Sequence, residues 1–388
     1  MSDSKAGLPC LEADVEKMTA YCTYCPKMCR FSCPTAAAEG RETVTPWGMM
    51  RLLELARDGS VPLDRDVADT FFHCTGCRRC RTYCRHGNDV PRALRQARRW
   101  VVDQDHLPEP LAEMDRDFAR HQTGFEEPPL SVDTDPFDQS SPIAFWPDCA
   151  TVQRSPKTVA AVGRLLEKVL GHKVRLIRNS DTGSPPCCGF PRFAAGITNE
   201  AQAQATLIEP LAGLEAVYTD CPALASFDTP QSSFCLPQSS ERPLARHLFD
   251  LLAERLPELG PPPSPFDLSE KTLHESCYIS RQIQGLDSVH KLLSLISEEP
   301  PLALPYQGEE SPCCGGRLHY RRLEPEASLD AARLVINSAP SQEEPLELMT
   351  TSSMCHCALA EAAGQESPQS RAEIISFLDL IATAYDCI

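Results

Sequence analysis

Two runs of closely spaced cysteines near the N-terminus constrain this chain more than any other feature. The stretch "CTYCPKMCRFSCP" supplies four cysteines, and "CTGCRRCRTYC" supplies four more in the CxxCxxCxxxC spacing of a cubane 4Fe-4S cluster. The first three thiolates of such a run wrap one cluster, whereas the fourth is displaced by a turn of chain and points toward the other. The spacing therefore predicts two clusters with crossed ligands: Cys22, Cys25, Cys29 and Cys84 for one, and Cys74, Cys77, Cys80 and Cys33 for the other.

Two departures from the usual ferredoxin pattern leave an alternative open. The gap between Cys25 and Cys29 is one residue longer than usual, and Cys84 is followed by Arg85 rather than by proline. Each CxxC pair alone also fits a structural zinc site, so a zinc-stabilised scaffold without redox function is the competing interpretation. Eight cysteines in two interlocking runs favour iron-sulfur clusters.

Composition and charge narrow the setting of the protein. The chain has 20 cysteines among 388 residues, and "MSDSKAGLPC" has neither the basic nor the apolar region of a secretion signal, so we expect a cytoplasmic location, where clustered cysteines bind metal. No apolar run approaches the roughly 20 residues of a membrane span, which leaves only membrane contact through a partner. A net charge of −17 argues against nucleic-acid binding. The arginine-rich stretch 78–99 fits a solvated helix face, charge balance for a cluster, or a docking site for a partner.

Pro-rich and Ser-rich stretches divide the chain into three segments. Residues 127–142 and 257–267 are predicted linkers, which leaves a ferredoxin-like domain at 1–126 and further domains at 143–256 and 268–388. The last two segments repeat each other in their alternation of strand and helix, which predicts two α/β domains with small parallel sheets. The expected fold class is therefore α+β multidomain, with a mainly helical first domain.

Paired cysteines occupy corresponding places in the two repeats, in "SPPCCGF" and "SPCCGG". Several cysteines of each repeat directly follow apolar strands, where parallel sheets gather their ligands. A disulfide between adjacent cysteines needs a strained ring, and a buried structural thiol explains one cysteine but not a group. Two neighbouring thiolates can instead reach different irons of one cluster, with the following glycine free to adopt a positive φ.

With these motifs, the chain resembles a known architecture from about residue 20 to 365. It is similar to the iron-sulfur subunits of glycolate oxidase type and to fused C–B subunits of heterodisulfide reductase type, in which a two-cluster ferredoxin module precedes two cysteine-rich CCG domains. The resemblance is carried by "TPWGMMRLLEL" between the cysteine runs, by "HESCYISR" around Cys277, and by "TDCPAL" around Cys221.

The resemblance implies further cluster ligands in both CCG domains. In heterodisulfide reductases such a domain binds a non-cubane 4Fe-4S cluster, here through Cys277, Cys313, Cys314, Cys355 and Cys357, which would be catalytic only in a disulfide reductase. The first CCG domain matches at Cys149, Cys187, Cys188 and Cys221, but Leu224 replaces the final cysteine, and Cys235 lies too far along to substitute readily. The first site is thus expected to hold an incomplete cluster, another cofactor or none, giving one or two clusters beyond the two cubanes.

No GxGxxG motif for a nicotinamide or flavin site follows a strand, so electrons must be exchanged with another subunit. The resemblance implies an iron-sulfur electron-transfer subunit of a cytoplasmic oxidoreductase complex. Its partners would be a flavin dehydrogenase, of glycolate or lactate type, and a quinone-linked or disulfide acceptor. The alternative is a heterodisulfide reductase-like catalytic subunit.

Several polar residues near the C-terminal cysteines have two possible roles. Arg281 and Arg317 are candidates for binding an anionic substrate or for balancing cluster charge. Three histidines are candidate proton donors or ordinary polar side chains: His274, His319 and His356. Cys10 and Cys387 lie outside every motif.

Overall fold

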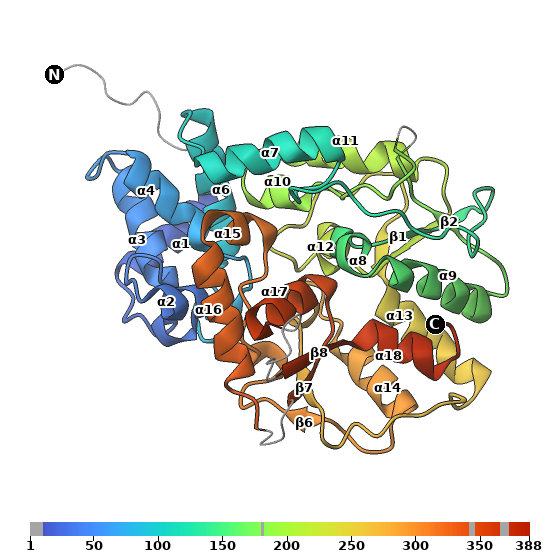
Figure 1. Cartoon of the computed structure of the whole chain (residues 1–388). Helices are drawn as coiled ribbons and strands as arrows, with labels where there is room; N and C mark the ends of the chain where they lie inside the picture. The colour runs from blue at the N-terminus through green and yellow to red at the C-terminus, as the bar shows by residue number, and fades with distance from the viewer. Residues whose placement is uncertain (1–10, 180–181, 341–345, 365–371) are drawn as a thin grey trace.

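The computed structural model describes residues 11–179, 182–340, 346–364 and 372–388; Cys10 lies outside this range. The N-terminal part is mainly helical, as predicted (Figure 1). Its elements are α1 (Ala13–Thr23), η1 (Arg30–Ser32), α2 (Pro34–Glu39), α3 (Pro46–Arg57), α4 (Arg65–Thr70), η2 (Phe71–His73), α5 (Arg79–Thr82), α6 (Val90–Asp103) and α7 (Glu109–His121).

Local sequence signals explain where the helices that frame the cysteine runs begin. The Thr45 hydroxyl accepts a hydrogen bond from the amide of Gly48 at 3.0 Å, and Pro46 occupies the first turn of α3. The Asp89 carboxylate likewise accepts a hydrogen bond from the amide of Arg92 at the start of α6. The first run covers the end of α1 and η1, the second covers α5, and the capped starts of α3 and α6 come after them in the chain.

The first repeat forms a parallel sheet of four strands in the order β2-β1-β3-β4. Its strands are β1 (Ile143–Trp146), β2 (Arg175–Leu176), β3 (Ala216–Thr219) and β4 (Ala245–His247). They are connected and covered by α8 (Cys149–Arg154), α9 (Pro156–Leu170), α10 (Phe190–Ala194), α11 (Glu200–Leu211), α12 (Pro222–Phe227), α13 (Leu248–Arg255) and η3 (Leu256–Leu259).

The second repeat has the same topology, in the order β6-β5-β7-β8. Its strands are β5 (Thr272–His274), β6 (Leu302–Ala303), β7 (Leu346–Thr350) and β8 (Ala372–Ser376). The helical elements are η4, a π-helical turn (Tyr278–Gln282), α14 (Leu286–Ile296), η5 (Gly308–Glu310), α15 (Leu318–Leu323), α16 (Pro325–Ile336), α17 (Ser353–Ala363) and α18 (Phe377–Ala384). The predicted pair of small parallel sheets is confirmed. In each sheet the chain order reverses between the first and third strands, β1 and β3 or β5 and β7, and parallel sheets bind their ligands outside the ends of the strands at such a point.

The two repeats pack through reciprocal contacts. Helix α9 of the first contacts α18 of the second, and α13 contacts α14; in the same way α8 contacts α17, and α12 contacts η4. Equivalent elements thus exchange roles across the interface, as in a twofold-symmetric dimer. A continuous apolar core runs through it and includes Val162, Leu252, Val289 and Ile381.

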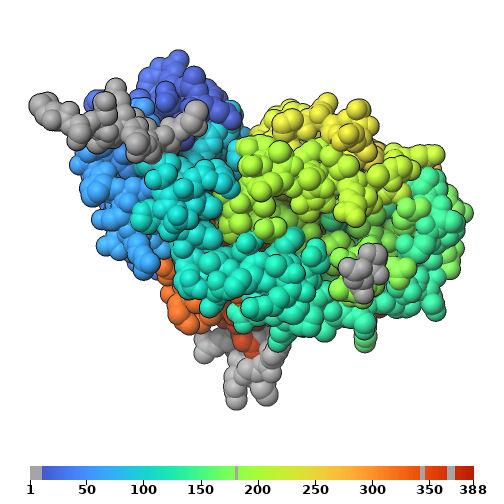
Figure 2. Space-filling view, turned by 90° about the horizontal axis from the view of Figure 1, so that it is seen from above, coloured from blue at the N-terminus to red at the C-terminus, as the bar shows by residue number. Residues whose placement is uncertain are grey.

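Buried arginines from the arginine-rich stretch join the N-terminal part to both repeats. Arg98, which is 2% exposed, donates hydrogen bonds to the carbonyls of Phe71, Cys74 and Ala194 at 2.6–2.8 Å. Arg78 donates to the carbonyls of Gln231 and Arg281 in the two repeats. Seen from above, the N-terminal part (blue) and the first repeat (green) form one continuous surface (Figure 2). Much of the arginine-rich stretch 78–99 is therefore buried between the N-terminal part and the two repeats and is not a solvated helix face.

We expect Arg98→Met to lower the free energy of unfolding by about 3 kcal/mol or more, because three buried carbonyls lose their charged donor. Chemical denaturation followed by circular dichroism would measure the loss. Arg246→Met, at an exposed arginine paired with Glu254, is the matched control and should change stability by less than about 1 kcal/mol. An equal effect of both substitutions would contradict the assigned role of Arg98.

Candidate iron-sulfur centres

The first predicted set of cysteines comes together near the C-terminal ends of α1 and α5. Cys25, Cys29 and Cys84 all lie close enough to Cys22 to act on its thiol electrostatically. Burial is the largest cause raising the pKa of Cys22, to about 12, and that of Cys29, to about 11. The Asn88 amide donates a hydrogen bond to Cys22 Sγ at 3.1 Å, a contact that would stabilise a thiolate.

The second predicted set lines one small cavity between α2, α3 and α6, together with Met49 and Val90; its cysteines are Cys33, Cys74, Cys77 and Cys80. Burial raises the pKa of Cys33 to about 12 and that of Cys74 to about 11. Backbone donors point at the sulfur atoms, as in the 3.4 Å contact from the Gly76 amide to Cys74 Sγ. The fourth cysteine of the first run therefore lies with the second run, and that of the second run lies with the first.

Four cysteines of the second repeat converge at the carboxyl ends of its strands: Cys277 after β5, Cys355 after β7, and the pair Cys313 and Cys314 after β6. The interaction with Cys314 is the main cause that lowers the pKa of Cys355, and the interaction with Cys277 is the main cause that raises the pKa of Cys313. Gly315 adopts a left-handed conformation, with φ of 74°, and its amide donates to Cys313 Sγ at 3.4 Å. The glycine after the paired cysteines thus has the positive φ expected of it.

The structure does not bring Cys357 to this group, although the resemblance implied that it belongs there. Cys355 and Cys357 are two residues apart on α17, so their side chains leave opposite faces of the helix. Cys357 packs instead toward α8, in the neighbourhood of Arg154, Arg321 and Asp148.

The first repeat also brings four cysteines together: Cys149, Cys187, Cys188 and Cys221. Their thiols lie close enough to shift one another's pKa: Cys149 interacts with Cys187, Cys187 with Cys188, and Cys188 with Cys221. Leu224 is fully buried, and only its amide reaches the group, donating to Cys221 Sγ at 3.4 Å. Cys235 lies apart, near Asp228, with its thiol bonded to the carbonyl of Leu236. Without Cys357 and Cys235, the two repeats offer matching sets of four cysteines.

Arg317 lies between the two repeat sites. Its guanidinium stacks on Tyr278, 3.5 Å from the ring centroid, with Phe190 at 5.8 Å. Burial disfavours its charge, but Tyr278 and then Cys277, Cys221 and Cys355 raise its pKa. A buried cation needs anionic neighbours, and deprotonated cysteines on both sides would supply them. The sequence is compatible with substrate binding or charge balance for Arg317, and its burial favours charge balance.

A sulfur contact connects the N-terminal cysteine sets to the second repeat. Cys77 and Cys313 belong to one buried cluster, and the interaction with Cys313 is the main cause that raises the pKa of Cys77. Cys313 Sγ also contacts the Thr75 hydroxyl at 3.5 Å. No signal in the sequence indicated that these two motifs, more than 200 residues apart, would meet.

The spacing of the thiols tests which metal they fit. All described cysteines are free, which excludes a disulfide between either adjacent pair. A tetrahedral zinc ion with Zn–S bonds of about 2.3 Å needs its sulfur atoms within about 4 Å of one another. Among the described residues, no three cysteines have sulfur atoms that all lie within 4.8 Å of one another. Among the described residues, no cysteine set therefore has the tight spacing of a tetrahedral zinc site.

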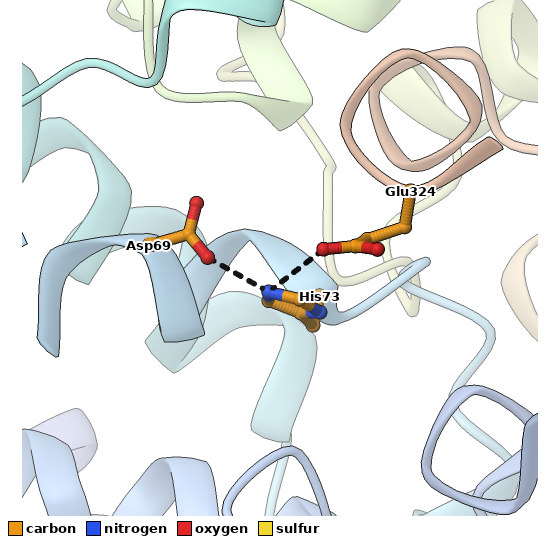
Figure 3. A group of neighbouring side chains, drawn as sticks. All are labelled: Asp69, His73 and Glu324. Carbon is orange, nitrogen blue, oxygen red and sulfur yellow. Dashed lines mark hydrogen bonds and ion pairs between the residues drawn. The ribbon is translucent and has the colours of Figure 1, made fainter. Parts of the chain in front are cut away.

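One group outside the cysteine sets does meet that distance limit: Asp69, His73 and Glu324 (Figure 3). His73 is fully buried, and its ring nitrogens bond to Asp69 at 3.1 Å and to Glu39 at 2.9 Å. Burial alone would lower the pKa of His73, but these carboxylates outweigh it and raise the pKa to about 9. The imidazole therefore keeps both protons near neutral pH and has no free nitrogen for a metal. The group is an ion-pair cluster that ties η2 to the turn between α15 and α16.

The three candidate proton-donor histidines form hydrogen bonds within the protein. Two of them contact backbone carbonyls through Nε2: His274 that of Pro312 at 3.2 Å, and His319 that of Cys74 at 3.0 Å. His356 contacts the carbonyl of Ile374 at 3.1 Å. Arg281 donates to the carbonyls of Cys77, Glu309 and Ser311. These contacts support the interpretation of the three histidines as ordinary polar side chains, and they show that Arg281 donates to backbone carbonyls.

Gly315→Ala should disrupt the C-terminal site and lower the iron content of the purified protein by about 4 per chain, if this site holds a four-iron cluster. A Cβ there would combine the strained positive φ with contacts of 2.9 Å to Ala331 Cβ and 3.0 Å to the Ser328 carbonyl. Gly364→Ala is the matched control, since Gly364 has φ of 64° but open space around it. Wild-type iron content in Gly315→Ala would contradict the close approach inferred at this glycine, and an equal loss of iron in Gly364→Ala would show that φ strain alone is sufficient.

Comparison with known proteins identifies two of these parts. A family profile described as a 4Fe-4S dicluster domain matches residues 18–88, and one described as a cysteine-rich domain matches residues 271–360. Two segments of the chain are thus similar to a 4Fe-4S dicluster domain and to a cysteine-rich domain. This combination confirms the resemblance drawn from the cysteine motifs. Both matched ranges leave out residues 89–270, so the first cysteine-rich repeat is assigned from its shared topology and cysteine set.

A curated relative supports the same assignment over a short range. A protein of Bacillus subtilis (strain 168) named "Probable glycolate oxidase iron-sulfur subunit" is 37% identical over 71 residues. The match spans 18% of this chain and 16% of the relative. No solved structure matches the chain. Among the described residues, no helix has the length and apolar character needed to cross a bilayer.

Proposed function

We propose that the chain is the iron-sulfur electron-transfer subunit of a cytoplasmic oxidoreductase complex. It would relay electrons between a flavin dehydrogenase, of glycolate or lactate type, and a quinone-linked or disulfide acceptor. Each bound cluster would accept and release single electrons. The chain's own cysteines would hold two cubanes and two further clusters, one in each cysteine-rich repeat.

The packing of Cys77 and Cys313 in one buried cluster, with Cys313 Sγ 3.5 Å from the Thr75 hydroxyl, carries this proposal. A relay needs neighbouring centres, and these two thiols belong to the second cubane set and to the C-terminal set. Arg317 extends the series, because it interacts with thiols of both repeat sites. The four cysteine sets thus form a sequence of neighbours, which suits transfer along the chain.

The burial of the C-terminal site favours a relay over a disulfide reductase. A disulfide substrate must reach the cluster, yet Cys277, Cys313, Cys314 and Cys355 are each at most 4% exposed. The nearby histidines, which a reductase would need as proton donors, are hydrogen-bonded to backbone carbonyls or buried side chains. The zinc scaffold is disfavoured by the open spacing of the thiols.

Freeze-quench EPR after a sub-stoichiometric pulse of photoreduced deazaflavin tests the relay. We expect signals of the cubane clusters to form first and to decay as those of the repeat sites grow. In Cys33→Ala, which should lack the second cubane, this transfer should slow at least tenfold. Cys235→Ala, at a cysteine outside all four sets, is the matched control. Independent reduction of all centres, at rates unaffected by Cys33→Ala, would rule out the relay.

A further inference from the structure

An unusual surface surrounds the first cubane set. Ten large hydrophobic side chains are exposed among the described residues, and four of them fall within residues 21–31, interleaved with the cysteines of the first run. Tyr24 is 89% exposed, Phe31 62% and Met28 61%; Tyr21 completes the group, which we call the aromatic rim. Exposed apolar side chains that cluster in this way mark an interaction site more often than isolated ones do.

The rim draws on both cysteine runs. Tyr21 stacks on His86 with ring centroids 5.5 Å apart, and Phe31 packs edge-on against Tyr83 at 4.8 Å. His86 and Tyr83 flank Cys84, the fourth cysteine of the set. Three cysteines of this set, Cys25, Cys29 and Cys84, keep partial exposure. The rim therefore surrounds the place where this cluster would come nearest to solvent.

Basic side chains border the rim, although the protein as a whole is strongly acidic. About one residue in seven is acidic in the whole chain, yet no acidic residue lies between Lys17 and Ala38 or between Arg78 and Asn88. Lys17 and Arg85 are exposed and form no ion pair with any described residue. Lys27 and Arg30 share a single carboxylate, that of Glu42. The rim thus presents positive charge around an apolar centre.

We propose that the aromatic rim and its basic border are the docking surface for a redox partner protein with an acidic face, which exchanges electrons with the first cubane cluster. The inference rests on the proposed electron-transfer function and deepens it by naming the site and the charge of the partner. Aromatic, Met and Arg side chains are the residues enriched at protein interfaces, and complementary charge speeds the encounter. An acidic partner fits best, because only a negatively charged face would be attracted electrostatically to Arg85, which forms no ion pair with any described residue.

Stopped-flow reduction by photoreduced flavodoxin, an acidic flavoprotein, provides the test on the full-length protein. Each rate is divided by the rate with photoreduced deazaflavin, a small uncharged donor, which corrects for changes in the clusters themselves. In the wild type, this ratio should fall about tenfold between low and high salt, because screening removes the attraction. Tyr24→Ser combined with Phe31→Ser, and separately Arg85→Glu, should each lower the ratio about tenfold at low salt.

Two control substitutions lie elsewhere on the surface. Leu259→Ser changes an exposed apolar side chain in η3, and Lys157→Glu reverses an exposed charge on α9, which lies across the molecule from α1 (Figure 1). Both should leave the ratio within twofold of the wild type. Because Arg85 is exposed and unpaired, its substitution tests the surface even if the double substitution impairs folding.

Three results would overturn the docking surface. The first is a ratio that neither salt nor the rim variants change, and the second is reduction by deazaflavin but not by flavodoxin. The third is a wild-type dimer, in light scattering, that Tyr24→Ser with Phe31→Ser converts to monomers, since a second copy would then cover the rim. A protein without iron, or one that deazaflavin fails to reduce, would instead overturn the electron-transfer function itself.

Discussion

Cys33→Ala and Cys74→Ala should abolish the same cluster, and Cys22→Ala and Cys84→Ala should abolish the other. Each variant is expected to lose about 4 irons per chain, because removal of one of four ligands opens a cubane cluster. The physical reason for the crossed grouping is the placement of Cys33 in the cavity lined by Cys74, Cys77 and Cys80. Iron analysis with low-temperature EPR of the reduced protein would show which signal disappears in each variant.

The controls for this experiment are cysteines outside the four sets. Cys387 is buried near Lys168 and Arg164, and Cys357 faces α8. Cys387→Ala and Cys357→Ala should both retain wild-type iron content and spectra. If Cys33→Ala and Cys22→Ala remove the same signal, each run holds its own cluster, and the crossed grouping is wrong.

Arg317→Met should lower the reduction potentials of the clusters in both repeats by on the order of 100 mV. Two unit charges several ångströms apart at an effective dielectric constant of about 20 interact by about 2–4 kcal/mol, which corresponds to about 100 mV for one electron. The cation stabilises the more negative, reduced cluster, so its loss makes reduction harder. EPR-monitored redox titration would measure both potentials in the same sample.

Arg317→Lys separates charge from other effects, because it retains the cation while losing the stacking on Tyr278. We expect it to preserve most of the wild-type potentials. Arg246→Met, at the surface of the first repeat, should leave them unchanged. A shift at only one repeat site would contradict the position of Arg317 between the two.

The cysteine spacing was sufficient to predict the first module. Ligand sets in tight CxxC loops are determined locally, and the crossed placement of Cys33 and Cys84 follows from the length of chain between neighbouring cysteines. The repeated sheets were also predictable, since the alternation of strands and helices and the position of cysteines after strands are local patterns. The structure has the same strand order in both repeats.

The features that sequence reasoning missed depend on contacts between distant segments. The resemblance placed Cys357 with the C-terminal set, but helical geometry turns it away from Cys355. The same resemblance implied that the first repeat lacks one cluster ligand, because Leu224 stands where a cysteine was expected. In the structure, however, each repeat brings four cysteines together. The contact of Cys77 with Cys313 and the burial of Arg317 arise from the packing of three segments on one another, which no short motif encodes.

The most direct test of this account is the metal and sulfide content of anaerobically purified protein, with the reduced EPR spectrum recorded on the same sample. Four sets of four cysteines predict about 16 irons and about 16 acid-labile sulfides per chain. Stoichiometric zinc in a colourless protein without sulfide would contradict the account and support a non-redox scaffold.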